Sequence, residues 1–75
     1  MKIRDAFAIN LRRARRAANL SQEELAHRAE IDRTYISALE RGVYSATIDV
    51  LDRLATALGI EASELLVRPR KPRGS

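Results

Sequence analysis

Apolar side chains recur three or four positions apart at the start of the chain. They are Ile3, Phe7, Leu11, Ala14 and Ala18. This spacing predicts an amphipathic helix over about residues 3–18, with these side chains on its buried face. The arginines at positions 12, 13 and 16 fall outside the apolar stripe, so we expect them to face solvent.

A second helix is predicted from a strong capping signal. Ser21 is the expected N-cap, and Glu24 lies three residues later as the reciprocal half of a capping box. Leu20 and Leu25 occupy the two positions of a hydrophobic staple. We expect this helix to end at about Ala29, and because it is short it must pack against other elements to be stable.

The third helix is predicted from Asp32, whose carboxylate suits an N-cap and the positive end of a helix. It is expected to run to about Arg41, and Gly42 is a natural stop. The link to the preceding helix is then about residues 30–32.

Two more helices complete the pattern. Thr47 is the expected cap of the fourth, which ends at Gly59, and a short fifth helix covers about residues 61–67. The sequence shows no strand signal, so we predict an all-α domain of five helices over residues 1–67. The fourth helix has its apolar face at Ile48, Leu51, Leu54, Ala55 and Leu58.

Length and composition exclude several classes. The chain has 75 residues, which is one domain, and no cysteine, which excludes disulfides and thiolate metal sites. No apolar run approaches the roughly 18 residues of a membrane span, and the N-terminus lacks a signal-peptide stretch. The expectation is therefore a soluble cytoplasmic protein.

The positive charge is concentrated at one end. The net charge is +4, yet residues 1–67 hold ten Lys/Arg and ten Asp/Glu. The other four basic residues lie in residues 68–75, which we expect to form a basic disordered tail. Such a tail either adds nonspecific, salt-sensitive attraction to DNA or only increases solubility.

The second and third helices, joined by a short link, have the arrangement of a helix-turn-helix at about residues 21–41. The small Ala26 allows a close crossing, and apolar contacts from Leu25, Ile31, Ile36 and Leu39 are expected to hold it. The alternative is an ordinary helical hairpin inside a bundle.

The residues of this pair resemble a known family. The segment Leu20–Ala26, then Ile31, then the segment Ile36–Gly42 resembles the lambda-repressor-like family of Cro and C1 repressors. The segment Asp32–Ser37 is especially similar to the controller proteins of restriction–modification systems. The resemblance covers about residues 5–66. It implies a compact five-helix domain that binds operator DNA, usually as a dimer, and therefore a sequence-specific transcriptional regulator.

Two positions depart from the family pattern. The usual glycine of the turn is Glu30, and the frequent proline before the fourth helix is Ala46. If position 30 needs a positive φ, glutamate there costs about 1 kcal/mol. The capping and apolar residues are intact, so the fold prediction is unchanged.

In this family the third helix enters the major groove, N-terminal end first. Its outward stripe is expected to read bases, whereas Ile36 and Leu39 face the core. Arg33 is the main candidate, because its guanidinium matches the O6 and N7 acceptors of guanine. The other base-reading candidates are Thr34, Tyr35, Ser37 and Ala38, and the alternative for each is a solvated helix face.

Other residues are candidates for the DNA backbone. Gln22 begins the second helix, where N–H groups and the helix dipole favour a phosphate, and the resemblance implies the same role. Arg41, Tyr44 and Ser45 are further phosphate candidates, although Tyr44 has packing against the fourth helix as an equal alternative. The resemblance also implies a largely buried ion pair between Arg15 and Glu40 with a structural role.

A homodimer is expected, because one helix reads only half a site. Its predicted surface lies on the far side from the third helix and comprises the fifth helix with parts of the fourth and the loop that follows it. The alternative is that these side chains only close the core of the monomer. A second hypothesis for function is a protein-interaction module, such as an antitoxin-like or adaptor domain. The candidate interface residues are Ile60, Leu65, Leu66 and Val67.

The sequence does not support an enzyme. His27 is the only histidine and has no second metal ligand beside it, so we expect it to face solvent. Asp49 and Asp52 lie at a helix start, where carboxylates are ordinary partners of the dipole. No glycine-rich phosphate loop is present. We therefore expect no cofactor, no metal and no small-molecule ligand, with double-stranded DNA and a second copy of the chain as partners.

Overall fold

The computed structural model describes residues 1–70. Four α-helices are present in this part of the chain, α1 (Ile3–Ala17), α2 (Gln22–Ala29), α3 (Arg33–Glu40) and α4 (Ile48–Leu58). A single turn of 3₁₀-helix, η1 (Ala62–Leu66), follows them. The described residues contain no strand, as the sequence predicted. Residues 71–75, the larger part of the expected tail, lie outside the described residues.

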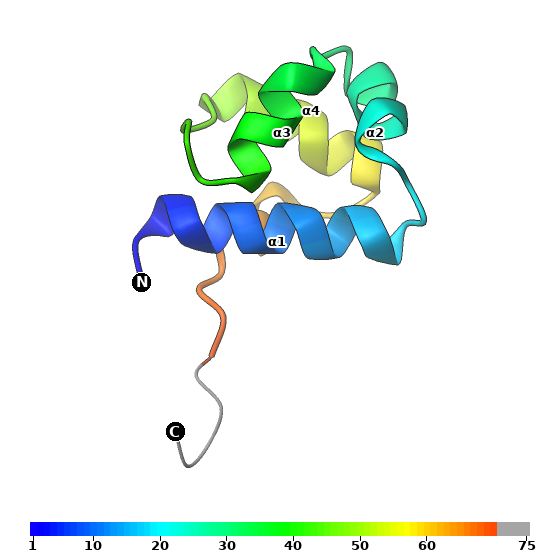
Figure 1. Ribbon diagram of the computed structural model, residues 1–75. Helices are drawn as coiled ribbons and strands as arrows, with labels where there is room; N and C mark the ends of the chain where they lie inside the picture. Colours follow the sequence, from blue (N-terminus) through cyan, green and yellow to red (C-terminus); the bar gives the residue numbers. More distant parts are fainter. Residues whose placement is uncertain (71–75) are drawn as a thin grey trace.

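The helices pack around one apolar core. Figure 1 shows α1 along one side of the molecule, with α2, α3 and α4 gathered over it. Helix α1 contacts α3 and η1, and α4 closes the far side by contacting α2 and η1. The largest fully buried side chains come from every element: Leu11, Leu25, Ile36, Leu39, Leu54 and Leu65.

The predicted caps are present. The Ser21 hydroxyl accepts from the backbone N–H of Glu24 at 3.0 Å, and Glu24 Oε1 accepts from the N–H of Ser21 at 2.9 Å. Asp32 and Thr47 likewise accept N–H groups at the starts of α3 and α4. These side chains satisfy backbone donors that a helix start leaves without partners, so each short helix begins where the sequence indicated.

Within residues 1–70, two non-glycine residues have left-handed backbone conformations. Glu30 ends α2 at φ +56°, which is the conformation anticipated for this position of the turn. Asn19, before α2, has φ +61° and was not anticipated. Gly42 is also left-handed, and a Cβ there would lie 3.2 Å from Asp5 Oδ1. The loop from α3 to α4 is therefore sharply turned at Gly42, where it passes close to α1.

The fifth helix is shorter and more tightly wound than predicted. One turn forms too few α-helical bonds to offset the cost of nucleation, and a three-residue repeat aligns Ala62 with Leu65. Leu65 is consequently 0% exposed and belongs to the core. Its prediction as a dimer-interface residue is wrong, because a side chain with no exposed surface cannot contact a second copy. Leu66 and Val67 are exposed, and Ile60 is half-buried.

Candidate nucleic-acid interface

Helices α2 and α3 form a close pair joined at residues 30–32. The backbone N–H of Ile31 donates to the carbonyl of Ala26 at 2.9 Å, which folds the chain back at the end of α2. Ala26 is buried at the crossing, as its small size led us to expect. The left-handed Glu30 then directs the chain to Asp32, where α3 begins. The pair has the geometry of a helix-turn-helix.

The outer face at the start of α3 is polar and open. Arg33 and Thr34 are exposed, and Ser37, one turn later, is half-buried. These three side chains line a shallow hollow of about 180 Å³. They provide a guanidinium, two hydroxyls and a methyl group on a surface with no apolar side chain of its own, which suits contact with base edges.

Ala38 does not share this face. It is 3% exposed, so the prediction that it lies on the outward stripe is wrong. The reason is that α3 packs against both α1 and α2, which buries more of its circumference than one partner helix would. Arg41, at the end of α3, is exposed, and its Nε donates to the carbonyl of Ser37 at 3.3 Å.

Beneath the start of α2 lies a buried ion pair. Arg15 Nε donates to Glu40 Oε2 at 2.7 Å, and Arg15 Nη2 donates to Glu40 Oε1 at 3.0 Å. The Glu40 side chain is 0% exposed and the Arg15 side chain 12% exposed. Arg15 Nη1 also donates to the carbonyl of Leu20 at 2.9 Å, so one guanidinium joins α1, α3 and the approach to α2.

The surroundings of Glu40 keep its carboxylate charged. Burial is the largest single effect and opposes the charge, but hydrogen bonds from Arg15 and Gln22 and the positive charges of Arg15 and Arg12 outweigh it. The pKa of Glu40 therefore lies below the ordinary value of a glutamate. Correspondingly, the hydrogen bond to Glu40 raises the pKa of Arg15, against the opposing effect of burial.

Gln22 lies between this ion pair and solvent. Its Nε2 donates to Glu40 Oε1 at 3.1 Å, and the residue is half-buried. An amide nitrogen carries two N–H donors, so one is used internally and the other is available to a ligand. Arg12 Nε lies 3.6 Å from the same Glu40 oxygen, with its side chain 46% exposed. Arg12 was expected only to face solvent, and its place three residues before Arg15 on the same helix was the signal for this second contact with Glu40.

The loop after α3 is held by its polar groups. Tyr35 donates its hydroxyl to the carbonyl of Ser45 at 3.1 Å, and its ring lies 6.3 Å from that of Tyr44. Arg4 Nε donates to the Ser45 hydroxyl at 3.1 Å, a contact that nothing in the helical pattern indicated. Tyr44 is 57% exposed, and the neighbour seen for its ring is Tyr35 of α3. The structure thus brings this loop beside α3, with Tyr44 and Ser45 on the surface.

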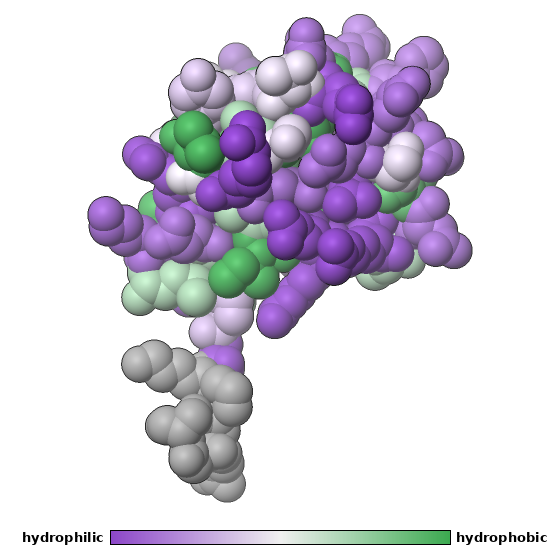
Figure 2. Space-filling view, in the orientation of Figure 1, coloured by the Kyte–Doolittle hydropathy of each residue, from purple (hydrophilic) through white to green (hydrophobic). Residues whose placement is uncertain are grey.

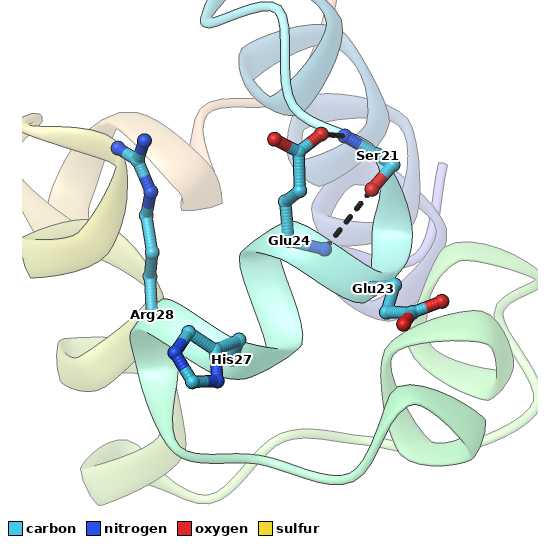
Figure 3. A pocket seen from close by; sticks show the side chains of 5 residues that line it. All are labelled: Ser21, Glu23, Glu24, His27 and Arg28. Carbon is cyan, nitrogen blue, oxygen red and sulfur yellow. Dashed lines mark hydrogen bonds between the residues drawn. The ribbon is translucent and has the colours of Figure 1, made fainter.

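Helix α2 presents a charged outer face. Figure 3 shows Glu24 turned back to Ser21 in the capping box, with Glu23, His27 and Arg28 along the same helix. His27 is exposed, as expected. Within residues 1–70 no group of three His, Asp or Glu side chains lies close enough to hold a metal ion. No helix in that part is long and apolar enough to cross a membrane.

Comparison with known proteins agrees with this architecture. A family model described as "Helix-turn-helix" matches residues 11–65. A hypothetical transcription factor of Neisseria meningitidis is 39% identical over 69 residues, which are 92% of this chain and 65% of that protein. The chain therefore spans slightly under two thirds of this relative.

Solved structures give the same result. The restriction–modification controller protein C.AhdI of Aeromonas hydrophila superposes with a TM-score of 0.80 at 42% identity, over 83% of this chain and 94% of that one. The controller protein C.Esp1396I, solved as a tetramer with its natural 35-base-pair operator, superposes with a TM-score of 0.77 at 25% identity, over 89% and 99%. The chain belongs to the helix-turn-helix family of Cro/C1 (XRE) type, with the restriction–modification controller proteins among its relatives.

Proposed function

We propose that this protein is a sequence-specific transcriptional regulator that binds a palindromic operator as a homodimer, with α3 in the major groove. The observation that carries the proposal is the polar face of α3. Arg33, Thr34 and Ser37 lie on this face, and the helix packs against α1 and α2. A rigid helix with exposed hydrogen-bonding side chains at its N-terminal end fits the reading of base edges. The complex of C.Esp1396I with its operator supports the proposal by similarity.

The side chains divide into two roles. Arg33 reads a guanine through its O6 and N7, and Thr34 and Ser37 contact neighbouring bases. The Tyr35 hydroxyl already donates to the loop, so Tyr35 contributes its ring edge and its support of that loop. The phosphate contacts come from the free N–H of Gln22 and from Arg41, Tyr44 and Ser45, which position the helix without reading sequence.

A second surface accounts for the homodimer. Exposed apolar side chains gather where the N-terminal ends of α1 and α4 meet η1, and a groove of about 270 Å³ runs between them. Figure 2 shows hydrophobic groups beside the point where the C-terminal segment leaves the helices. We call this the apolar patch, and its exposed members are Met1, Ile3, Ile48, Leu66 and Val67.

The occupant of the apolar patch is a second copy of the chain. Leu66 and Val67 connect it to the surface predicted from the sequence, and Ile60 lies half-buried near the same elements. None of the exposed patch residues belongs to α3, so a dimer formed through the patch leaves both recognition helices free, and Ser45 at the edge of the groove is the one proposed phosphate contact that borders the patch. Two copies related by a twofold axis read half-sites about one helical turn, roughly 34 Å, apart.

The proposal assigns no catalytic residue and no cofactor. It places the protein in the cytoplasm, as a regulator that binds bacterial DNA. The alternative of a pure protein-interaction module predicts no preference among DNA sequences, so the experiment below separates the two.

The test is selection of the purified protein on random duplex DNA at physiological salt, followed by sequencing. The expected result is an enriched palindrome whose half-sites lie about one turn apart. Arg33→Ala is expected to relax one position in each half-site and to weaken binding by about 1–3 kcal/mol. Arg13→Ala is the matched control, because it removes an equal charge from an exposed position of α1, outside α2, α3 and the turn between them. Binding without an enriched sequence, or equal losses in the two variants, would refute the proposal.

A further inference from the structure

Asn10 joins α1 to the end of the described chain. Its Nδ2 donates to the carbonyl of Leu65 at 3.0 Å and to the carbonyl of Val67 at 2.6 Å. An amide nitrogen has two N–H donors, so both are used on this one segment. The contacts span more than fifty positions of sequence, and no caps or helix periodicity explains them.

The segment has little local structure to fix its path. Helix η1 is one 3₁₀ turn, and Val67 is already extended, at φ −73° and ψ +124°. The last carbonyls of a helix have no partners within it, and those of Leu65 and Val67 are satisfied from α1 by Asn10. The direction in which the chain leaves η1 therefore depends on a side chain of another element.

Further anchors lie on either side of the exposed residues. The Leu65 side chain is fixed in the core, and Arg68 Nε donates to the carbonyl of Met1 at 2.9 Å. Between these anchors stand Leu66, 39% exposed, and Val67, 62% exposed. Both belong to the apolar patch. The hydrogen bonds of Asn10 that hold the backbone of residues 65–67 therefore also hold the shape of that surface.

We propose that Asn10 is a positioning residue for self-association: it holds residues 65–67 so that Leu66 and Val67 form one surface with Ile3 and Ile48 that receives a second copy of the chain. This rests on the homodimer of the proposed function. Asn10 itself is half-buried behind the surface and acts through the backbone that it holds.

The decisive variant is Asn10→Asp. It keeps the shape of the side chain but replaces the donating nitrogen with an oxygen that faces two carbonyl oxygens. Asn10→Ala removes the donors without adding charge, and it serves if the aspartate variant does not fold. The matched control is Ser21→Ala, which removes a helix cap on α2, far from the apolar patch, and lowers stability without altering residues 65–67.

Dimer dissociation constants are measured by sedimentation equilibrium on the full chain, at a temperature where circular dichroism shows each variant to be fully folded. We expect both Asn10 variants to weaken the dimer by about tenfold or more, a size that the loss of two hydrogen bonds of ordinary strength can supply. Ser21→Ala is expected to stay within about twofold, since an exposed cap on α2 does not touch the interface. In NMR spectra the methyl groups of Leu66 and Val67 should shift in the Asn10 variants alone.

The outcomes separate the two proposals. A wild type that dimerises with an affinity unchanged by either Asn10 variant overturns the role of Asn10 and leaves the dimer in place. Equal weakening by Ser21→Ala overturns it too, because the effect would then follow general stability. A wild type that is monomeric up to millimolar concentration overturns the homodimer itself, and the role of Asn10 with it.

Discussion

Replacing Arg15 by methionine removes the partner of a buried charge. Methionine is also long and favours helices, so the helix itself is preserved. The substitution deletes three hydrogen bonds, two to Glu40 and one to the carbonyl of Leu20. Glu40, with a side chain 0% exposed, is left with the Gln22 amide at 3.1 Å and with Arg12 at 3.6 Å. The carboxylate would then be buried with incomplete compensation.

The expected cost follows from this geometry. Breaking a buried ion pair by removing one partner costs about 3–5 kcal/mol, and the remaining contacts of Glu40 favour the lower end. A loss of about 3 kcal/mol is a large part of the stability of a domain of this size. It corresponds to a fall in melting temperature of roughly 12–24 °C.

The pH dependence of the loss distinguishes this cause from general damage. In the wild type the folded pKa of Glu40 is lowered, so its contribution to stability is present above the ordinary glutamate pKa and is lost as the pH falls through the folded value. In Arg15→Met burial is no longer outweighed, and the pKa of Glu40 is expected to rise. Protonation then relieves the penalty as the pH falls, so the difference between the two proteins shrinks in acid.

The assay is urea unfolding followed by circular dichroism at about pH 7, 5.5 and 4. Arg13→Met is the control, because Arg13 is an exposed arginine on the same helix and its loss changes the net charge equally. Equal costs for the two variants, or a cost of Arg15→Met that stays constant over this pH range, would refute the reasoning.

Four further substitutions test particular positions, each by urea unfolding at a protein concentration low enough to keep the chain monomeric. Ser21→Ala should lower the free energy of unfolding by about 1 kcal/mol through loss of the cap, and no change would contradict the capping box. Glu30→Gly should raise it by roughly 1 kcal/mol, because glycine adopts a positive φ without strain; destabilisation would show that the glutamate side chain matters more. Leu65→Ala should cost about 2–5 kcal/mol as a core deletion. Val67→Ala, at an exposed position, should stay within about 0.5 kcal/mol, and similar costs at positions 65 and 67 would contradict their different burial.

Local sequence determined much of the fold. The caps at Ser21, Asp32 and Thr47 were recognisable because a hydroxyl or carboxylate at a helix start acts on backbone groups only two or three residues away. The left-handed Glu30 was anticipated from the resemblance of the turn to its family, although glutamate has no intrinsic preference for that conformation.

The burial and contacts of residues that lie between several elements could not be predicted from local sequence. Ala38 lies on the predicted outward stripe of its helix, but two neighbouring helices bury it. Leu65 was predicted to lie on an exposed apolar surface, but η1 is a 3₁₀ turn that directs its side chain into the core. The partners of Asn10 could not be found from periodicity, because they are backbone carbonyls more than fifty residues away.

Helix α1 connects the two surfaces of the proposed function although it enters neither the major groove nor the turn. Arg15 holds Glu40 and, through it, the amide of Gln22 on the DNA-facing side, whereas Asn10 holds residues 65–67 on the side of the apolar patch. Five residues separate Asn10 and Arg15, so their side chains point roughly 140° apart around a helix of 3.6 residues per turn. One straight helix thereby sets the offset between the DNA-binding face and the dimer surface of each copy. If the protein forms the proposed twofold dimer, we expect that offset to set the separation of the two α3 helices, and the spacing of operator half-sites would then depend on two polar side chains for which we propose no base contact.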